Sequence, residues 1–252
     1  MLRLLAIVVL GLTTFLVLSP ETLSPPDKRI LFIGNSFTFG GDVPTQVRNI
    51  AITSTPSVNY HVEMVVRGGT TLTEHLTETN AIDTLENGDW DVVVLQDASV
   101  MSFHPQWRSE MVHATSIFAE LAQEQGAEVL YYSHWSPNIE YIAENTPIKD
   151  TATAIAHIEQ TYENISSDTG GSVAYAGRVW QMADDAGITA LYEADEHHAS
   201  IKGAYAAALA ISAVLGDIDP GTSTWAPKEV PFSEQEQLRA MASTLSVAED
   251  SN

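Results

Sequence analysis

Cysteine is absent from this chain of 252 residues. The protein therefore has no disulfide bonds, no thiol nucleophile and no metal site with cysteine ligands. Basic residues are also scarce, because 11 lysines and arginines stand against 33 acidic residues and leave a formal charge of −22. Such a chain repels nucleic acids and anionic membrane surfaces, and we expect neither as a partner. Kinase, P-loop and zinc-protease motifs are missing too.

The N-terminal apolar stretch, residues 4–18, is short for a membrane span of ~20 residues. It follows Arg3, a pattern typical of a secretory signal. We predict that residues 1–19 are a signal peptide or, since no clear cleavage site follows, an uncleaved N-terminal anchor. In both cases the rest of the chain is expected to be exported, to the periplasm or the outside. The proline-rich residues 20–28 are predicted to be a linker.

Strand and helix patterns alternate along the rest of the chain. Apolar stretches such as ILFI at residues 30–33 and VVVL at residues 92–95 are typical of buried parallel strands. Strands are predicted at residues 30–33, 60–66, 91–95, 128–132 and 172–175. Helices are predicted at residues 43–53, 71–76, 107–125, 151–167 and 201–215, the last ended by Gly216. The alternation predicts an α/β fold: a three-layer αβα sandwich with a central, mostly parallel five-stranded sheet of the flavodoxin-like kind.

Polar segments follow the predicted strands. In open parallel sheets the ligand site lies beyond the carboxyl ends of the strands. The first four strands are followed by GNS at residues 34–36, RGGTTL at residues 67–72, QDAS at residues 96–99 and SHWSP at residues 133–137. We therefore expect glycines, hydroxyls, an amide and aromatic rings to gather at one rim.

Ser36 stands where the first strand gives way to a helix. At a helix N-terminus its backbone N–H points outward, and the helix dipole favours an anion there. Its hydroxyl can attack a carbonyl once a base removes the proton. The alternative interpretation is that Ser36 only caps the helix.

Asp195 and His198 lie three residues apart just before the alanine-rich helix. A carboxylate at this spacing can accept from Nδ1–H of the imidazole, which leaves Nε2 free to act as a base toward a serine. We interpret His197 as a bystander. A zinc site on Asp195, His197 and His198 lacks the HExxH spacing, and no metal is predicted. A solvated acidic loop is the alternative.

Two further residues are candidate donors to an oxyanion. Gly69, in the pair Gly68-Gly69, allows its N–H to approach a ligand closely. Gln96 ends an apolar strand with its amide at the rim. A tight turn at the glycines and a pairing of the amide with a neighbouring loop are the alternatives.

These segments together resemble the SGNH (GDSL-like) hydrolase family from residue 30 to residue 216. IGNSFT at residues 33–38 is similar to its first block, with Asn35 in place of the usual aspartate, and GGTTL at residues 68–72 to its second. DEHHAS at residues 195–200 is similar to its last, Asp-x-x-His block. LQDAS at residues 95–99 departs from the family's Gly-x-Asn-Asp, so the resemblance implies Gln96 as the side-chain donor, with Asp97 and Ser99 as rivals.

The resemblance implies an SGNH-type catalytic domain over residues 29–218, a serine esterase acting on a short-acyl carboxylic ester of a small molecule or carbohydrate. Ser36 is the expected nucleophile, His198 the base and Asp195 its partner, with an oxyanion hole of Ser36, Gly69 and Gln96. No cofactor is implied, and no membrane partner beyond the possible N-terminal anchor.

Asn35, Trp107 and Trp135 are predicted to contact the substrate, and Tyr132 to join the two tryptophans in an aromatic wall. Ordinary packing is the alternative for the aromatic rings. Residues 219–252 are predicted to be a C-terminal extension with a short helix opened by SEQE at residues 233–236.

Two other functions fit the same pattern. One is a flavodoxin-like module that binds a phosphate or flavin at GNSFTFGG, residues 34–41, which leaves Asp195 and His198 without a role. The other is a non-hydrolytic sugar-binding or acyl-transfer protein on the same scaffold. The G-x-S-x-G elbow of α/β-hydrolases is missing, since Phe37 and Thr38 follow Ser36.

Overall fold

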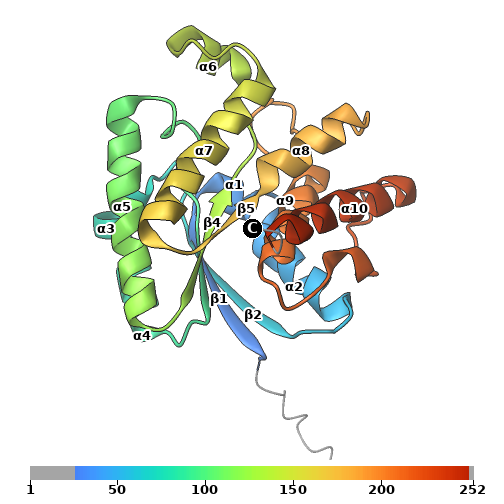
Figure 1. Ribbon diagram of the computed structural model, residues 1–252, viewed down its shortest axis with the longest axis horizontal. Coiled ribbons are helices and arrows are strands. Elements are labelled where there is room, and N and C mark those ends of the chain that lie inside the picture. Colours follow the sequence, from blue (N-terminus) through green and yellow to red (C-terminus); the bar gives the residue numbers. More distant parts are fainter. Residues whose placement is uncertain (1–25, 250–252) are drawn as a thin grey trace, which may run out of the picture.

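The central sheet has five strands in the order β2-β1-β3-β4-β5, and every neighbouring pair is parallel. The computed structural model describes residues 26–249, with side chains up to residue 245. The predicted signal or anchor, residues 1–19, and most of the predicted linker lie outside them. The strands are β1 (Lys28–Gly34), β2 (Tyr60–Val66), β3 (Val92–Leu95), β4 (Glu128–Ser133) and β5 (Ser172–Tyr175). The predicted fold class is confirmed (Figure 1).

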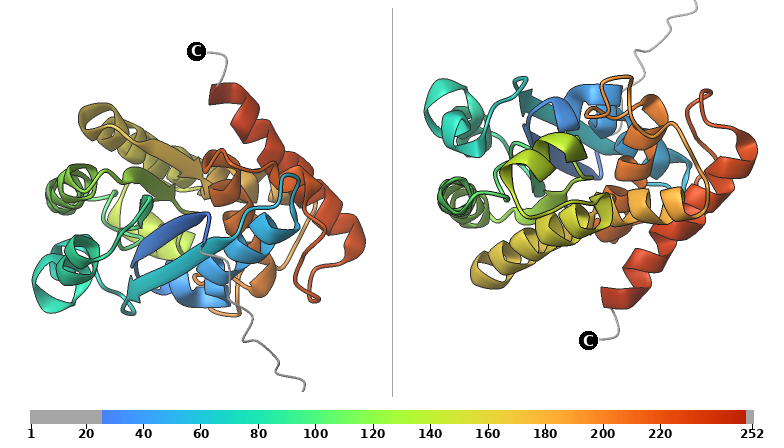
Figure 2. Two further views of the ribbon diagram at one scale, coloured as in Figure 1. Left: turned by 90° about the horizontal axis from the view of Figure 1, so that it is seen from below. Right: turned by 90° about the horizontal axis from the view of Figure 1, so that it is seen from above.

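Helices cover both faces of this sheet. One layer holds α2 (Val43–Thr53), α8 (Ala176–Asp185), α9 (Ile201–Val214) and, packed on α8 and α9, α10 (Phe232–Glu249). The other holds α3 (Leu72–Glu78), α4 (Ala81–Asn87), α5 (Pro105–Glu124), α6 (Ile139–Asn145) and α7 (Thr151–Thr169). Short helices are α1 (Ser36–Phe39), η1 (Gly40–Asp42) and η2 (Pro220–Thr222). Figure 2 shows the sheet between the two layers.

The alternation of side chains along β1 divides the core in two. Ile30 and Phe32 pack under α2, α8 and α9, whereas Leu31 and Ile33 pack under α3, α4 and α5. Because both faces are covered, the middle of the strand is apolar throughout, as expected for a buried parallel sheet.

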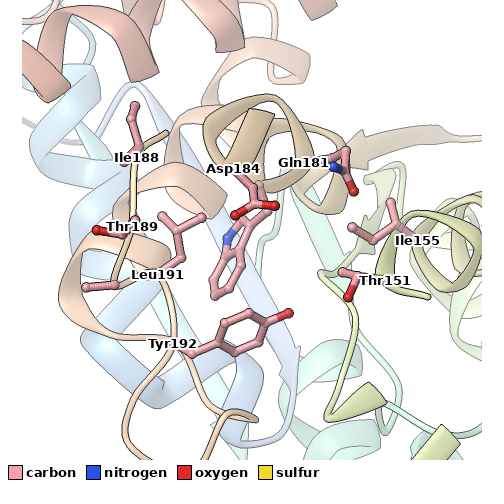
Figure 3. Close-up of a pocket in the computed structure, with 10 residues that line it drawn as sticks. Thr151, Ile155, Gln181, Asp184, Ile188, Thr189, Leu191 and Tyr192 are labelled. Atoms are coloured by element: carbon pink, nitrogen blue, oxygen red, sulfur yellow. The ribbon is translucent and has the colours of Figure 1, made fainter. Parts of the chain in front are cut away.

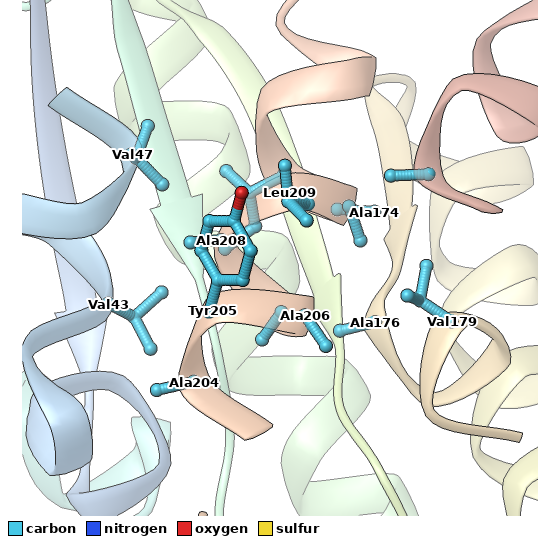
Figure 4. Close-up of a cluster of buried hydrophobic side chains, with 14 of the residues drawn as sticks. Val43, Val47, Ala174, Ala176, Val179, Ala204, Tyr205, Ala206, Ala208 and Leu209 are labelled. Atoms are coloured by element: carbon cyan, nitrogen blue, oxygen red, sulfur yellow. The ribbon is translucent and has the colours of Figure 1, made fainter. Parts of the chain in front are cut away.

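Helix α9 is buried along almost its whole length, from residue 203 to residue 213. Its alanines let α2 and α8 approach closely, as the side chains of Val43, Ala206 and Val179 illustrate (Figure 4). The Ser200 hydroxyl caps the helix by accepting from the N–H of Gly203. Gly216, with φ of 74°, follows its C-cap as predicted. This cap fixes the chain just after the predicted Asp-x-x-His segment.

The C-terminal extension differs from its prediction. Helix α10 has 18 residues and begins at Phe232, where the carbonyl of Pro231 accepts from the N–H groups of Glu234 and Gln235. A helix is therefore present where SEQE predicted one, but it is longer than predicted and begins before Ser233. Leu238 and Ala242 of α10 are buried in the same core as α9. Within residues 26–249, no helix combines the length and the apolar character that crossing a membrane requires.

Candidate active site

The turn that carries Ser36 is built from its neighbours. Helix α1 begins directly at Ser36, and its cap is Asn35, whose Oδ1 accepts from the N–H of Phe37 at 3.1 Å. Gly34 has no room for a side chain, since a Cβ there would collide with the Thr38 hydroxyl and lie 2.8 Å from Gln96 Oε1. Because Asn35 does the capping, the hydroxyl of Ser36 is left for another partner.

That partner is His198. The distance from Ser36 Oγ to His198 Nε2 is 3.0 Å, and the distance from His198 Nδ1 to Asp195 Oδ2 is 2.6 Å. The structure thus brings together three side chains that are 162 and 3 residues apart along the chain. The distances are those of a serine, a histidine base and an orienting carboxylate.

The loop of residues 193–198 holds Asp195 and His198. Asp195 Oδ1 accepts from the N–H groups of His197 and His198, each at 3.0 Å. Glu193 N–H donates to the carbonyl of His198, and Glu196, with φ of 53°, closes the turn by donating to Glu193. The Asp195 and His198 side chains are 51% and 39% exposed. The hydrogen bonds from the ring and backbone of His198 hold the pKa of Asp195 well below its ordinary value.

Two predicted backbone donors lie in one cleft with the side chains of Ser36 and His198. Ser36 and Gly69 both line it, and within residues 26–249 neither backbone N–H has a hydrogen-bond acceptor. Gly69 has φ of 69°, which favours glycine. Its loop is held from below, where Asn35 Nδ2 donates to the carbonyl of Thr70 at 3.1 Å. The N–H of Leu72 donates to Asp97 Oδ1 at 2.9 Å.

Gln96 lies behind the turn, away from the cleft. It is buried, and its Oε1 accepts from the N–H of Asn35 at 3.1 Å and from the hydroxyl of Thr38 at 3.0 Å. Its Nε2 donates to the carbonyl of Asp97. Because Gly34 leaves space under the turn, the amide reaches there instead of the rim. The predicted third oxyanion donor is therefore a support of the turn in this structure.

The predicted substrate contacts need the same kind of correction. Asn35, Trp135 and Tyr132 are buried and do not line the cleft. The ring of Trp135 stacks on Phe37, which agrees with the packing alternative. Trp107 is 38% exposed but borders a separate cavity of about 110 Å³ with Tyr141, at the start of α5.

The cleft itself is open and has a volume of about 640 Å³. It is lined by Ser36, Phe39, Gly40, Gly41, Gly68, Gly69, Glu193, His197, His198 and Ala199. Four glycines leave the floor without side chains, and Phe39 is the one large apolar lining residue, 40% exposed. No lysine or arginine is among these lining residues. The lining of the cleft is therefore mostly apolar, and its ionisable side chains are one carboxylate and two imidazoles.

His197, which was predicted to be a bystander, and Phe39, for which no role was predicted, both line the cleft. The ring of His197 packs edge-on against His198, with centroids 4.8 Å apart, and burial, with His198 next to it, lowers its pKa. His197 adjoins the base in sequence, and Phe39 lies three residues from Ser36, almost one helical turn. These short separations along the chain from His198 and Ser36 were the sequence signal that could have identified both residues. No group of three or more potential metal ligands occurs in the described residues.

Buried polar residues surround the site without entering it. Asp97 is buried at the end of β3, and burial raises its pKa to about 6. Its Oδ1 accepts from Leu72 and Ala98, and Oδ2 has no hydrogen-bond partner in the part of the chain that is described. His75 Nε2 lies 2.8 Å from the carbonyl of Gly34, which is thereby fixed just before the turn. These groups stabilise the shape of the site.

A second cavity, of about 230 Å³, is lined by residues 188–192 and by parts of α7 and α8 (Figure 3). Thr151 and Ile155 of α7 face Asp184 of α8 and Tyr192 across it. The hydroxyl of Tyr192 donates to the carbonyl of Ser136 at 2.9 Å. No serine or histidine lines this cavity, so it offers no counterpart to the Ser36 cleft.

Comparison with known proteins identifies the fold. No protein-family model and no curated protein sequence matches the chain. A solved structure from Slackia heliotrinireducens, provisionally assigned to the SGNH hydrolases, has a TM-score of 0.63 and 24% identity. The match covers 75% of this chain and 99% of that one.

Two other solved structures are similar. A DUF4886 family protein from Bacteroides uniformis has a TM-score of 0.71 and 15% identity, over 88% of this chain and 96% of that one. A catalytic mutant of an acetylxylan esterase from Geobacillus stearothermophilus has a TM-score of 0.57 and 13% identity, over 77% and 96%. With its parallel five-stranded sheet and its two helix layers, this chain has the SGNH-hydrolase-like fold.

Proposed function

We propose that the protein is a serine esterase that hydrolyses carboxylic esters. The observation that carries the proposal is the continuous chain of contacts from Ser36 Oγ to His198 Nε2, 3.0 Å, and from His198 Nδ1 to Asp195 Oδ2, 2.6 Å, at the wall of an open cleft. The similarity to SGNH-type structures supports a hydrolase of this general kind.

In the proposed reaction, Ser36 Oγ attacks the ester carbonyl while His198 Nε2 takes the hydroxyl proton. Asp195 keeps the imidazole oriented and stabilises its protonated form. The N–H groups of Ser36 and Gly69 stabilise the oxyanion in this proposal, a role worth roughly 10²–10³ in kcat for a single donor. His198 then gives its proton to the leaving alcohol, and water, activated by the same imidazole, releases the acid from Ser36.

The lining of the cleft indicates the substrate class. Its apolar, glycine-rich floor accommodates a neutral group, and Glu193 disfavours an anionic one. We propose a short acyl group, such as acetyl, on a neutral alcohol or carbohydrate. An acetylxylan esterase among the similar structures is consistent with this substrate class.

The phosphate-binding alternative has less support. Helix α1 has only four residues, so its dipole is weak, and that function gives no role to the contact between His198 and Asp195. Acyl transfer uses the same three side chains with a sugar hydroxyl in place of water. Faster acetyl transfer to an added sugar than to water would identify the transferase.

Labelling with a serine-directed phosphonate, followed by peptide mapping, tests the proposal. We expect modification at Ser36 and loss of hydrolysis of p-nitrophenyl acetate in Ser36→Ala. Ser109→Ala, an exposed serine on α5, is the matched control and should keep the wild-type rate. A folded Ser36→Ala variant with an unchanged rate would disprove the assignment.

We also propose that residues 1–19 direct the chain out of the cytoplasm and that residues 29–218 contain the catalytic domain. Expression of the whole chain, followed by fractionation and N-terminal sequencing, tests the export. A mature protein that begins after residue 19 is expected for a signal peptide, and an intact N-terminus in the membrane fraction for an anchor.

A further inference from the structure

Trp135 contacts both halves of the proposed site, although it is fully buried. It lies two residues beyond β4, and its ring stacks between Phe37, with centroids 4.3 Å apart, and Trp180, with centroids 4.5 Å apart. Its indole N–H donates to the carbonyl of His197 at 3.0 Å. Phe37 follows the proposed nucleophile directly, and His197 precedes the proposed base.

The hydrogen bond from Trp135 to His197 is unusual because most hydrogen bonds of the 193–198 loop join residues within the loop. Those of Glu193, Asp195 and Glu196 remain inside the loop. Within residues 26–249, only two hydrogen bonds join this loop to the rest of the domain. One is the contact between Ser36 and His198 itself, and the other is the bond from Trp135. Among the described residues, the indole N–H thus makes the one hydrogen bond to this loop that does not take part in the proposed chemistry, and the rings of His197 and His198 also contact Phe37 edge-on.

The other side of Trp135 is rigid. Phe37 is held by the aromatic stack and by the hydroxyl of Tyr132, which donates to its carbonyl at 3.2 Å. A displacement of the loop relative to Phe37 therefore requires the bond between Trp135 and His197 to break or bend.

We propose that Trp135 is a positioning residue that sets the distance between Ser36 Oγ and His198 Nε2 through His197. The inference rests on the proposed esterase function. A misplacement of about 1 Å between reacting groups can cost on the order of 10² in rate. Loss of the tether is expected to lower kcat by ~10–100-fold and to leave KM nearly unchanged, because Trp135 does not line the cleft.

Two matched variants test this role. Trp135→Phe keeps an aromatic ring in the stack and removes the N–H that holds His197. Trp180→Phe makes the same change in the neighbouring ring, which is also buried and whose N–H donates to the carbonyl of Gly203 in α9 at 3.0 Å. We expect comparable losses of melting temperature but a fall in kcat for Trp135→Phe alone. Equal losses of kcat in the two variants would reduce Trp135 to a packing residue and overturn the inference.

Replacement of Trp135 by benzothienylalanine keeps the ring shape and removes only the N–H. This variant tests the same role if Trp135→Phe does not fold. The expected result is the same fall in kcat with the wild-type melting temperature nearly kept. A wild-type rate in this variant would contradict the role of the hydrogen bond.

A spectroscopic readout separates this inference from the proposed function. The proton between His198 Nδ1 and Asp195 is expected to give a downfield proton NMR signal, which would report the loop geometry without any substrate. We expect Trp135→Phe, but not Trp180→Phe, to shift or broaden it. An unchanged signal would refute the positioning role even if the protein proves not to be an esterase, and an unreactive Ser36 with a shifted signal would refute only the esterase.

Discussion

The two halves of the proposed site are built in opposite ways. The Ser36 half rests on buried side chains that directly follow β1 and β3, where Asn35, Gln96 and Asp97 are held by several hydrogen bonds. The His198 half is an exposed acidic loop held by the hydrogen bond from Trp135 and by ring contacts with Phe37. The proposed nucleophile is therefore fixed by the core, whereas the proposed base depends on a few contacts. Changes in the buried residues that support Ser36 should cost stability, and changes in the His198 loop should cost rate.

The largest effect on kcat is expected from a substitution in the exposed His198 half of the proposed site. His198→Ala removes the base and should lower kcat by ~10⁴-fold or more, with little loss of stability. His197→Ala, which leaves the base in place, should cost much less. Steady-state kinetics on p-nitrophenyl acetate and thermal unfolding measure the two effects. A similar fall in both variants would mean that the imidazoles share the role.

Substitutions in the buried half of the proposed site should mainly change the free energy of unfolding. Gly34→Ala places a methyl group against Thr38 and Gln96 and is expected to lower the free energy of unfolding by ~1–3 kcal/mol. Gly40→Ala is the control, since nothing lies within 4 Å of its added Cβ. Urea denaturation compares them. Equal stability of the two variants would show that the turn yields without cost.

Asp97, in the buried half, should make the free energy of unfolding depend on pH. Its pKa is raised by burial from 3.8 to about 6, so the folded state binds more protons than the unfolded state between these values. The free energy of unfolding should then fall as the pH rises from about 4 to about 6, by on the order of 2 kcal/mol, and level off above. Asp97→Asn should lack this component in denaturation curves between pH 4 and pH 7. If the free energy of unfolding depends on pH in the same way in the wild type and in Asp97→Asn, Asp97 does not make this contribution.

Asp195, in the exposed half, titrates in the opposite direction. Its pKa is lowered, so any stability it contributes is present above its ordinary pKa and is lost as the pH falls toward the lowered value. Because the side chain is half exposed, the contribution should be small.

The smallest effect concerns charge at the cleft. Glu193→Gln should raise kcat/KM for an anionic ester, such as a p-nitrophenyl hemisuccinate, by a few-fold at low salt. The rate for neutral p-nitrophenyl acetate should stay unchanged. If added salt does not reduce the difference, the effect of Glu193 is steric and not electrostatic.

Much of the fold was predictable because its signals are local. Short apolar stretches marked the five strands, and Gly216 marked the end of α9. Helices α4, α6 and α8 were missed, and two of these have only seven residues each, too few for a clear helical period. The spacing of Asp195 and His198 allowed their contact to be predicted, since a tight turn brings positions three apart together.

The sequence by itself determined the parallel sheet, the place of Ser36 at the end of the first strand and the carboxylate–imidazole pair, because each follows from neighbouring residues and their periodicity. Only the tertiary structure decided that Gln96 turns under Gly34, that Trp135 is buried between Phe37 and Trp180, and that His197 faces the cleft. Those outcomes depend on the space left between elements that are distant in the chain, and side-chain direction follows that space and not the spacing of residues.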